Sequence, residues 1–380
     1  MKRKAYLDGG ATYCSAGIHI ETIWQHLVSG QRALSELPCP AFDSWPWPQV
    51  FTVEEPSFKT LNVDRKLLRT MEKQSAVALY GATLALHDSA VLGDYDKSRV
   101  GLYMGLPTVE DPAPTWSSLQ MLHENGGRVG IAEACLRETP PFFALTQLNS
   151  SACAHIAGTF GMTGAMGAYS PFSDAGLHAV IEAALSLHES ENDAALVGGV
   201  SQKINPLLLL QYEHLGWTKD PTRIPGEGAA FVVLNTEAKG THRIWVSGYA
   251  RGFISDDFMP DAYAHILRQA LSMASIDAAA VDWMLADAES AGELAALRAL
   301  YGAADIPLGG CRQACGVLGP AEPIVNLLLA EHGMHHGKRL CIRGADGLLT
   351  EELQPIRHAL ICTRGPEGQY VVVILSAELA

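Results

Sequence analysis

The sequence lacks any run of about 20 apolar residues, the length a membrane-spanning helix needs, so no such span is expected. It also lacks paired cysteines, since its eight cysteines show neither a Cys-x-x-Cys motif nor regular spacing. We therefore expect reduced thiols in a cytoplasmic protein rather than a disulfide framework. Residues 2–4 are basic, but Asp8, Gly9 and Gly10 follow before any apolar segment of a signal peptide develops.

Basic residues are also scarce, with 27 Lys and Arg against 41 Asp and Glu and a formal net charge of −14. This excess of acid disfavours nucleic acid and anionic membrane surfaces as partners. With 380 residues, 48% of them hydrophobic, the chain can bury a large core and is too long for one small domain.

Strand and helix patterns alternate along the chain, which is typical of an α/β fold. Strands are predicted over residues 4–7, 100–104, 165–169, 194–197, 231–234, 244–249, 281–285 and 370–375. Helices are predicted over residues 18–29, 67–92, 177–188, 262–274, 292–301 and 323–332. Gly9 and Gly10 are predicted to lie in a loop after the first strand, and Gly198 and Gly199 to end the strand over 194–197. A polar segment at 238–240 indicates an N-terminal half, residues 1–240, and a C-terminal half, residues 241–380.

The strongest local signal lies in residues 149–200. A strand over 165–169 is followed by a tight turn and a helix over 177–188, and Ser173 stands at the apex of the turn. A turn of this kind projects its apex side chain beside a helix N-terminus, where backbone N–H groups and the helix dipole favour negative charge. The pattern therefore predicts a nucleophile elbow. Asp174 is expected to cap the helix that follows.

This arrangement resembles the β-ketoacyl synthase family of the thiolase fold, whose elbow reads Ala-Cys-x-x-Gly with the Cys as acyl-accepting nucleophile. Counting forward from Thr163-Gly164 and back from Gly176 places Ser173 at the Cys position. The resemblance covers nearly the whole chain and is most specific in residues 141–235. It implies an α/β fold class with a thiolase-like, duplicated α-β-α-β-α layered architecture.

The same resemblance locates the family's other reacting groups, and each is altered. Asp287 stands at the first catalytic His, and Val317 stands at the second, after Arg312 in place of the family's Lys. The gating loop, Gly- and Phe-rich in the family, is degenerate here: Arg364, Gly365, Pro366 and Gly368. A serine hydroxyl is a weak nucleophile without an adjacent base, which neither Val nor an isolated carboxylate supplies well. We therefore expect no catalytic residues, no condensing activity of the chain alone and no cofactor.

The resemblance then implies a chain-length factor of type II polyketide or aryl polyene biosynthesis, pathways related to fatty acid biosynthesis. Such a subunit forms a heterodimer with an active ketosynthase across the sheet edge and meets acyl carrier protein through that complex. Bulky side chains in the acyl tunnel limit chain growth by steric exclusion. Candidate tunnel or interface residues are Trp116, Leu119, Met121, Leu122, Phe142, Phe143, Asn149 and His155. Trp116 and Met121 could equally be core residues.

Two alternatives remain open. Ser173 could be an acyl acceptor in a divergent ketosynthase or acyltransferase, with His155 or His178 as its base. The chain could instead be a homodimeric ketosynthase-like protein with a structural role.

No metal site is expected. Cys153 and His155 form a pair that lacks further spaced ligands. A second group of histidines, which we expect to be solvated at a helix end, comprises His332, His335 and His336.

Overall fold

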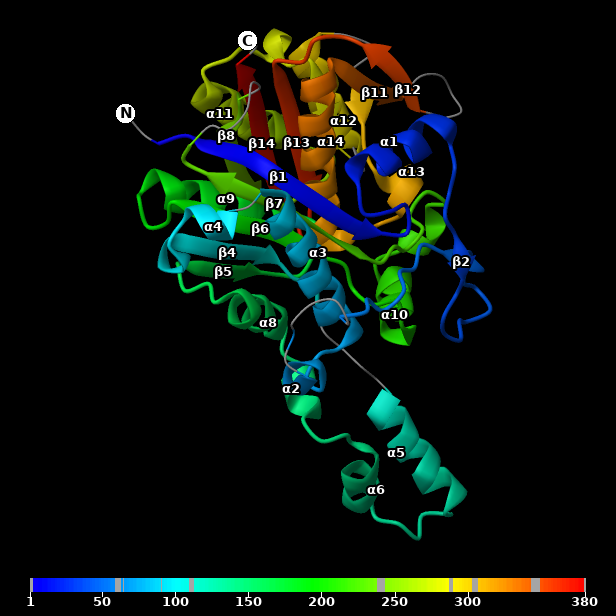
Figure 1. Cartoon of the computed structure of the whole chain (residues 1–380). Helices are drawn as coiled ribbons and strands as arrows, with labels where there is room; N and C mark the ends of the chain where they lie inside the picture. Colours follow the sequence, from blue (N-terminus) through cyan, green and yellow to red (C-terminus); the bar gives the residue numbers. More distant parts are fainter. Residues whose placement is uncertain are drawn as a thin grey trace.

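Ten strands form one mixed sheet in the order β10-β9-β13-β14-β8-β1-β7-β6-β4-β5 (Figure 1). The computed structural model describes residues 3–58, 63, 65–89, 91–108, 113–237, 243–286, 290–302, 307–342 and 349–378. The strands of this sheet are β1 (Ala5–Cys14), β4 (Val100–Gly105), β5 (Met166–Tyr169), β6 (Ala194–Val200), β7 (Gly228–Asn235), β8 (Arg243–Phe253), β9 (Trp283–Leu285), β10 (Leu308–Gly309), β13 (His358–Arg364) and β14 (Gln369–Glu378). Two small antiparallel sheets pair β2 (Ser35–Glu36) with β3 (Gln49–Val50) and β11 (Lys338–Ile342) with β12 (Leu349–Leu353).

The strand order repeats. In the N-terminal half the order is β1-β7-β6-β4-β5, and in the C-terminal half it is β8-β14-β13-β9-β10. In both halves the first strand of the sheet along the chain lies beside the fifth, followed by the fourth, the second and the third. The first, fifth and fourth strands pair antiparallel in both halves, and the fourth, second and third pair parallel. A short antiparallel pairing of β1 with β8 joins the halves. The boundary predicted between residues 240 and 241 falls outside the described residues and stays a prediction, which this repeat supports.

Helices lie outside both half-sheets and between them. They are α1 (Ile20–Ser29), α2 (Arg65–Leu68), α3 (Lys73–Ser89), α4 (Val91–Asp94), α5 (Ala113–Glu124), α6 (Ile131–Glu138), α7 (Phe143–Thr146), α8 (Ser151–Phe160), α9 (Asp174–His188), α10 (Pro206–His214), α11 (Pro260–Ala274), α12 (Ala291–Tyr301), α13 (Arg312–Cys315) and α14 (Glu322–His336). Helix α9 contacts β4, β6 and β14, and α14 contacts β7 and β13, so these two form the central layer. Helix α3 covers β1 and β7, whereas α11 covers β8 and β14. The predicted thiolase-like layered fold is confirmed.

Two glycine pairs lie inside strands, where the sequence predicted breaks. Strand β1 continues through Gly9 and Gly10 with a register shift, and a Cβ on Gly10 would lie 2.7 Å from the carbonyl oxygen of Phe231. Strand β6 continues through Gly198 and Gly199, and a Cβ on Gly199 would lie 2.2 Å from the carbonyl oxygen of Pro320. Both predictions were wrong because these glycines permit close approach between elements rather than a turn.

Part of the segment between β4 and β5, the part that contains α5 and α6, leaves the body of the protein. Helices α5 and α6 pack on each other and lie apart from the layered core, below it in Figure 1. These two helices cover little of the core. No helix among the described residues is both long enough and apolar enough to cross a membrane.

Candidate functional site

The predicted elbow is present between β5 and α9. Ser173 occupies the N-cap position of α9 with φ −60° and ψ −33°, and its side chain makes no capping hydrogen bond. Asp174 is the first helical residue rather than the cap, so that prediction was wrong. A Cβ on Gly176 would lie 2.2 Å from the carbonyl oxygen of Pro320, so the elbow packs too tightly there for any side chain.

The Ser173 hydroxyl, which is largely buried, has two partners on β13. Thr363 donates its hydroxyl to Ser173 Oγ at 2.7 Å, and Ser173 Oγ donates to the carbonyl oxygen of Arg364 at 3.2 Å. The single proton of the serine hydroxyl is therefore directed at a backbone carbonyl. A carbonyl oxygen cannot take that proton, so this geometry leaves the serine without a general base.

Ser173 opens onto a pocket with an empty volume of about 550 Å³. Val317, Arg364 and Pro366 line the same pocket, although they come from different elements. The structure thus brings Ser173 together with three other positions at which the resemblance predicts altered reacting or gating groups. Asp287 lies outside the described residues.

Several pocket residues were missed by sequence reasoning: Phe172, Gln202, Tyr212, Trp217 and Arg223. The ring of Trp217 stands 5.0 Å from that of Tyr212 and 6.3 Å from that of Phe172, measured between centroids. The Arg223 guanidinium lies 4.7 Å from the Trp217 ring, in cation–π geometry. The apolar run at 205–211 and the Trp217 turn were visible in the sequence, but their approach to Ser173 depends on packing.

Backbone hydrogen bonds hold Val317 in place. Its N–H donates to the carbonyl of Ile224 at 2.8 Å, and its carbonyl accepts from Gly226 at 3.0 Å. Its side chain belongs to a buried apolar cluster that also contains Phe51 and Ile224. This residue can shape the pocket, but it cannot accept or donate a proton.

Arg312, which the resemblance places at the family's Lys position, lies on α13 and lines the pocket. Its Nε donates to Glu322 Oε1 at 2.6 Å, and Glu322 is almost fully buried. Arg364 similarly pairs with Asp257, so its guanidinium is held at the end of β13 while its carbonyl faces Ser173. The degenerate loop then turns through Gly365 and Gly368, the latter at φ +106°, a conformation that favours glycine.

Burial raises the pKa of Asp174 to about 6. Its Oδ1 atom has no hydrogen-bond partner, and a Cβ on Gly365 would lie 2.5 Å from it. His178 Nε2 lies 3.8 Å from Asp174 Oδ2, but burial, followed by the charge of Arg251, lowers the pKa of His178. His178 is thus neutral at pH 7 and provides no charged partner.

Neither histidine considered as a base reaches Ser173. His178 Nδ1 lies 3.3 Å from an Arg251 nitrogen, and its ring stacks on Tyr169. His155 is buried on α8 away from the residues that line the pocket, and burial lowers its pKa. Among the described residues, the Ser173 hydroxyl hydrogen-bonds only with the Thr363 hydroxyl and the Arg364 carbonyl.

A comparison with models of protein families matches residues 9–239 to the model for the β-ketoacyl synthase N-terminal domain. The chain belongs to the β-ketoacyl synthase family. A search of curated proteins finds no match.

Solved structures share the fold of this ketosynthase-family chain. A β-ketoacyl synthase from Burkholderia phymatum STM815 is 16% identical over 100% of both chains, with a TM-score of 0.79. The ishigamide ketosynthase/chain length factor is 18% identical over 99% of both chains, with a TM-score of 0.82. A type II polyketide synthase acyl-carrier protein in complex with its ketosynthase gives a match of 18% identity over 100% of both chains, with a TM-score of 0.74.

The candidate tunnel and interface residues of this ketosynthase-family chain do not line the Ser173 pocket. Trp116 and Phe142 are each 59% exposed, and Leu119 is also exposed, so the alternative that Trp116 is a core residue was wrong. The remaining candidates are half-buried, apart from the buried His155: Met121, Leu122, Phe143 and Asn149.

The sequence patterns also singled out the pair Cys153 and His155 and the histidines near residue 332. Cys153 Sγ lies 3.5 Å from Met104 Sδ, and burial raises the pKa of this thiol to about 12. Residues two apart on a helix do not face each other, which separates Cys153 from His155. His335 and His336 are exposed as expected, but the His332 side chain is only 10% exposed, so the prediction of a solvated residue was wrong there.

Proposed function

We propose that this chain is a non-catalytic ketosynthase-like subunit that pairs with an active β-ketoacyl synthase and limits the length of its product. The observation that carries the proposal is the Ser173 hydroxyl, which stands at the nucleophile position and donates to the Arg364 carbonyl instead of to a base. Condensation requires an acyl acceptor, and a hydroxyl becomes one only when a base removes its proton.

The chemistry of the pocket supports the same proposal. Its described lining residues include neither a cysteine nor a histidine, and Val317 lines it where the resemblance predicts a catalytic imidazole. The pocket instead contains the aromatic rings of Phe172, Tyr212 and Trp217. Rings of this size occupy volume and restrict an acyl chain by steric exclusion.

Strand β5 and the segment that precedes it in sequence support pairing with another ketosynthase. Strand β5 is an edge strand of the ten-stranded sheet, and an edge strand can pair with a strand of another chain. Exposed large apolar side chains concentrate in the neighbouring segment: Trp116, Leu119, Ile131, Leu136, Phe142, Leu145, Leu148 and Met166. Apolar side chains gathered on one surface mark protein interfaces.

Two neighbours suggest the biological setting. One is named for a ketosynthase/chain length factor, and another contains an acyl-carrier protein with its ketosynthase. We infer a cytoplasmic heterodimer that meets acyl carrier protein in type II polyketide or aryl polyene assembly. The alternative is a divergent ketosynthase or acyltransferase in which Ser173 carries the acyl group.

The first experiment replaces Ser173 by Ala in a complex co-expressed with an active ketosynthase. We expect condensation rates within about twofold of the unsubstituted complex, because Ser173 does not enter the reaction. The purified subunit alone should neither condense acyl and malonyl thioesters nor form an acyl adduct in mass spectrometry. An adduct on Ser173, together with loss of activity in Ser173→Ala, would establish the acyltransferase alternative.

The second experiment tests the interface separately. Leu136 on α6 and Leu353 on β12 are both 82% exposed, so Asp should cost either fold little. Leu136→Asp should weaken the heterodimer at least about tenfold, since it places a charge in the proposed apolar contact. Leu353→Asp should leave the affinity unchanged. Equal effects of the two variants, measured by calorimetry, would refute this interface.

A further inference from the structure

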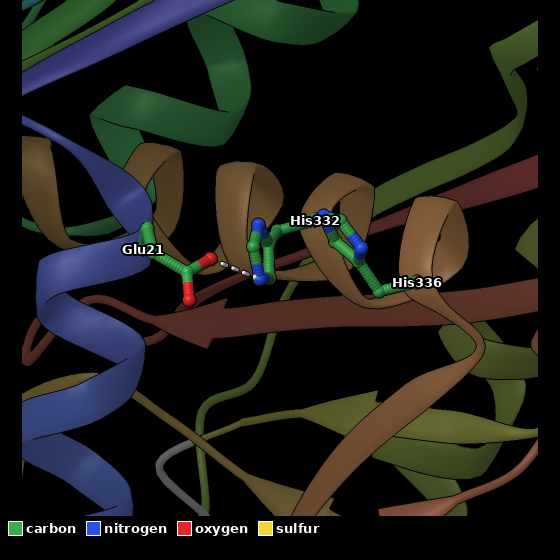
Figure 2. Close-up of side chains that lie close together, drawn as sticks. All are labelled: Glu21, His332 and His336. Carbon is green, nitrogen blue, oxygen red and sulfur yellow. Dashed lines mark ion pairs between the residues drawn. The ribbon is translucent and has the colours of Figure 1, made fainter.

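Helices α1 and α14 bring together three side chains from opposite ends of the chain (Figure 2). Glu21 lies in the first turn of α1, and His332 and His336 lie one turn apart near the end of α14. Residues four apart on a helix share one face, so both imidazoles of α14 can turn toward the same point. These residues are not among those that line the Ser173 pocket.

The distances suit a shared ion. His332 Nε2 lies 3.0 Å from Glu21 Oε2, and one donor atom from each of the three residues lies within 4.8 Å of the others. A tetrahedral zinc ion with bonds of about 2.0–2.1 Å holds its ligands about 3.3 Å apart. The rings of His332 and His336 lie 4.4 Å apart between centroids, and the exposed His336 side chain can change rotamer without disturbing the core.

The surroundings hold His332 in place. Its side chain is 10% exposed, and its ring lies against that of Trp24 at 5.0 Å between centroids. Trp24 is itself fixed, because its Nε1 donates to Glu351 Oε2 at 2.6 Å. Partners that orient a ligand in advance raise metal affinity.

The opposite side of the cluster is open. Glu21 is 59% exposed and receives a hydrogen bond from Gln25 on Oε1, which leaves Oε2 directed at His332. The neighbouring positive charge of Lys338 is paired with Glu351 at 3.1 Å. An ion can therefore enter from solvent and retain water as a fourth ligand.

We propose that Glu21, His332 and His336 bind one zinc ion, which ties the first helix of the chain to the central-layer helix of the second half. Two imidazoles and one carboxylate form a donor set that zinc accepts, whereas Mg²⁺ and Ca²⁺ prefer all-oxygen sites. The site joins residues that are more than 300 positions apart in sequence. It acts on the scaffold and is independent of the function proposed for the Ser173 pocket.

The test uses the full chain, stripped of metal and titrated with ZnCl2 in a calorimeter. We expect one equivalent to bind at micromolar or lower concentration and to raise the melting temperature. His336→Ala should weaken binding by about 100-fold, and Glu21→Gln by about tenfold. His335→Ala is the matched control, since this exposed histidine lies on the same helix outside the cluster, and it should bind zinc like the unsubstituted chain.

A Co²⁺ titration identifies the ligands. The visible spectrum should show tetrahedral nitrogen and oxygen coordination, without a thiolate charge-transfer band from any of the eight cysteines. Circular dichroism of His336→Ala checks that this surface substitution leaves the fold intact. A thiolate band, equal binding by His336→Ala and the unsubstituted chain, or equal losses in His335→Ala and His336→Ala would overturn the proposal.

Discussion

Replacement of Asp174 by Asn should stabilise the protein at neutral and alkaline pH. The carboxyl is 5% exposed, its Oδ1 atom has no hydrogen-bond partner, and burial raises its pKa from the ordinary 3.8 to about 6. The folded protein therefore holds this proton more tightly than the unfolded chain. The stability that the protonated Asp174 contributes to the folded protein is fully present below about pH 4 and is lost as pH rises through about 6.

The size of the effect follows from the two pKa values. The difference between 3.8 and about 6 corresponds to about 3 kcal/mol of destabilisation above pH 6. Asn has nearly the same shape and no charge, so Asp174→Asn removes this loss. Part of the gain is offset because the N-terminus of α9 favours a negative charge by about 0.3–1 kcal/mol. We expect a net gain of about 2 kcal/mol.

Urea unfolding followed by circular dichroism at about pH 4 and pH 8 measures the effect as a double difference. The variant should match the unsubstituted chain at the lower pH and exceed it at the higher. Asp261→Asn is the matched control, because Asp261 also lies in the first turn of its helix, α11, but is exposed. The free energy of unfolding of Asp261→Asn should be about 0.5 kcal/mol lower than that of the unsubstituted chain at pH 8. A less stable Asp174→Asn protein at pH 8 would show that the carboxylate is solvated or paired.

Two further substitutions test the scaffold by calorimetric melting. Glu227 accepts hydrogen bonds from the N–H groups of Val53 and Ile204 and pairs with Lys73, so Glu227→Gln should cost about 3 kcal/mol. Glu133→Gln is the control, because the ion pair of Glu133 with Arg137 is exposed and its loss should lower the free energy of unfolding by less than about 1 kcal/mol. Equal losses of stability in Glu227→Gln and Glu133→Gln would contradict the argument. Gly176→Ala should cost about 1–3 kcal/mol, because its Cβ would lie 2.2 Å from a carbonyl oxygen. Gly158→Ala, with open space around the new methyl group in α8, should gain about 0.5–1 kcal/mol, so a loss there would refute the steric argument.

Local patterns in the sequence determined most of the elements and the elbow. Strand β4 and helix α1 were predicted within two residues, and Gly30 ends α1 in the left-handed conformation, at φ 67°. The placement of Ser173 at the turn before α9 required only counting from neighbouring glycines. These features depend on residues close in sequence, for which periodicity and turn chemistry suffice.

Only the tertiary structure decided which of these residues meet. Ser173 and Arg364 are 191 positions apart, and their hydrogen bond exists because α9 packs between the two half-sheets. The same packing explains why Gly198 and Gly199 continue a strand, since the Phe231 ring lies where a side chain on Gly198 would stand and the Pro320 backbone lies where one on Gly199 would stand. Packing also explains why His332, predicted to be solvated, is largely buried and pairs with Glu21. Contacts of this kind depend on how layers fit together, and a linear pattern of apolar and polar residues does not record that fit.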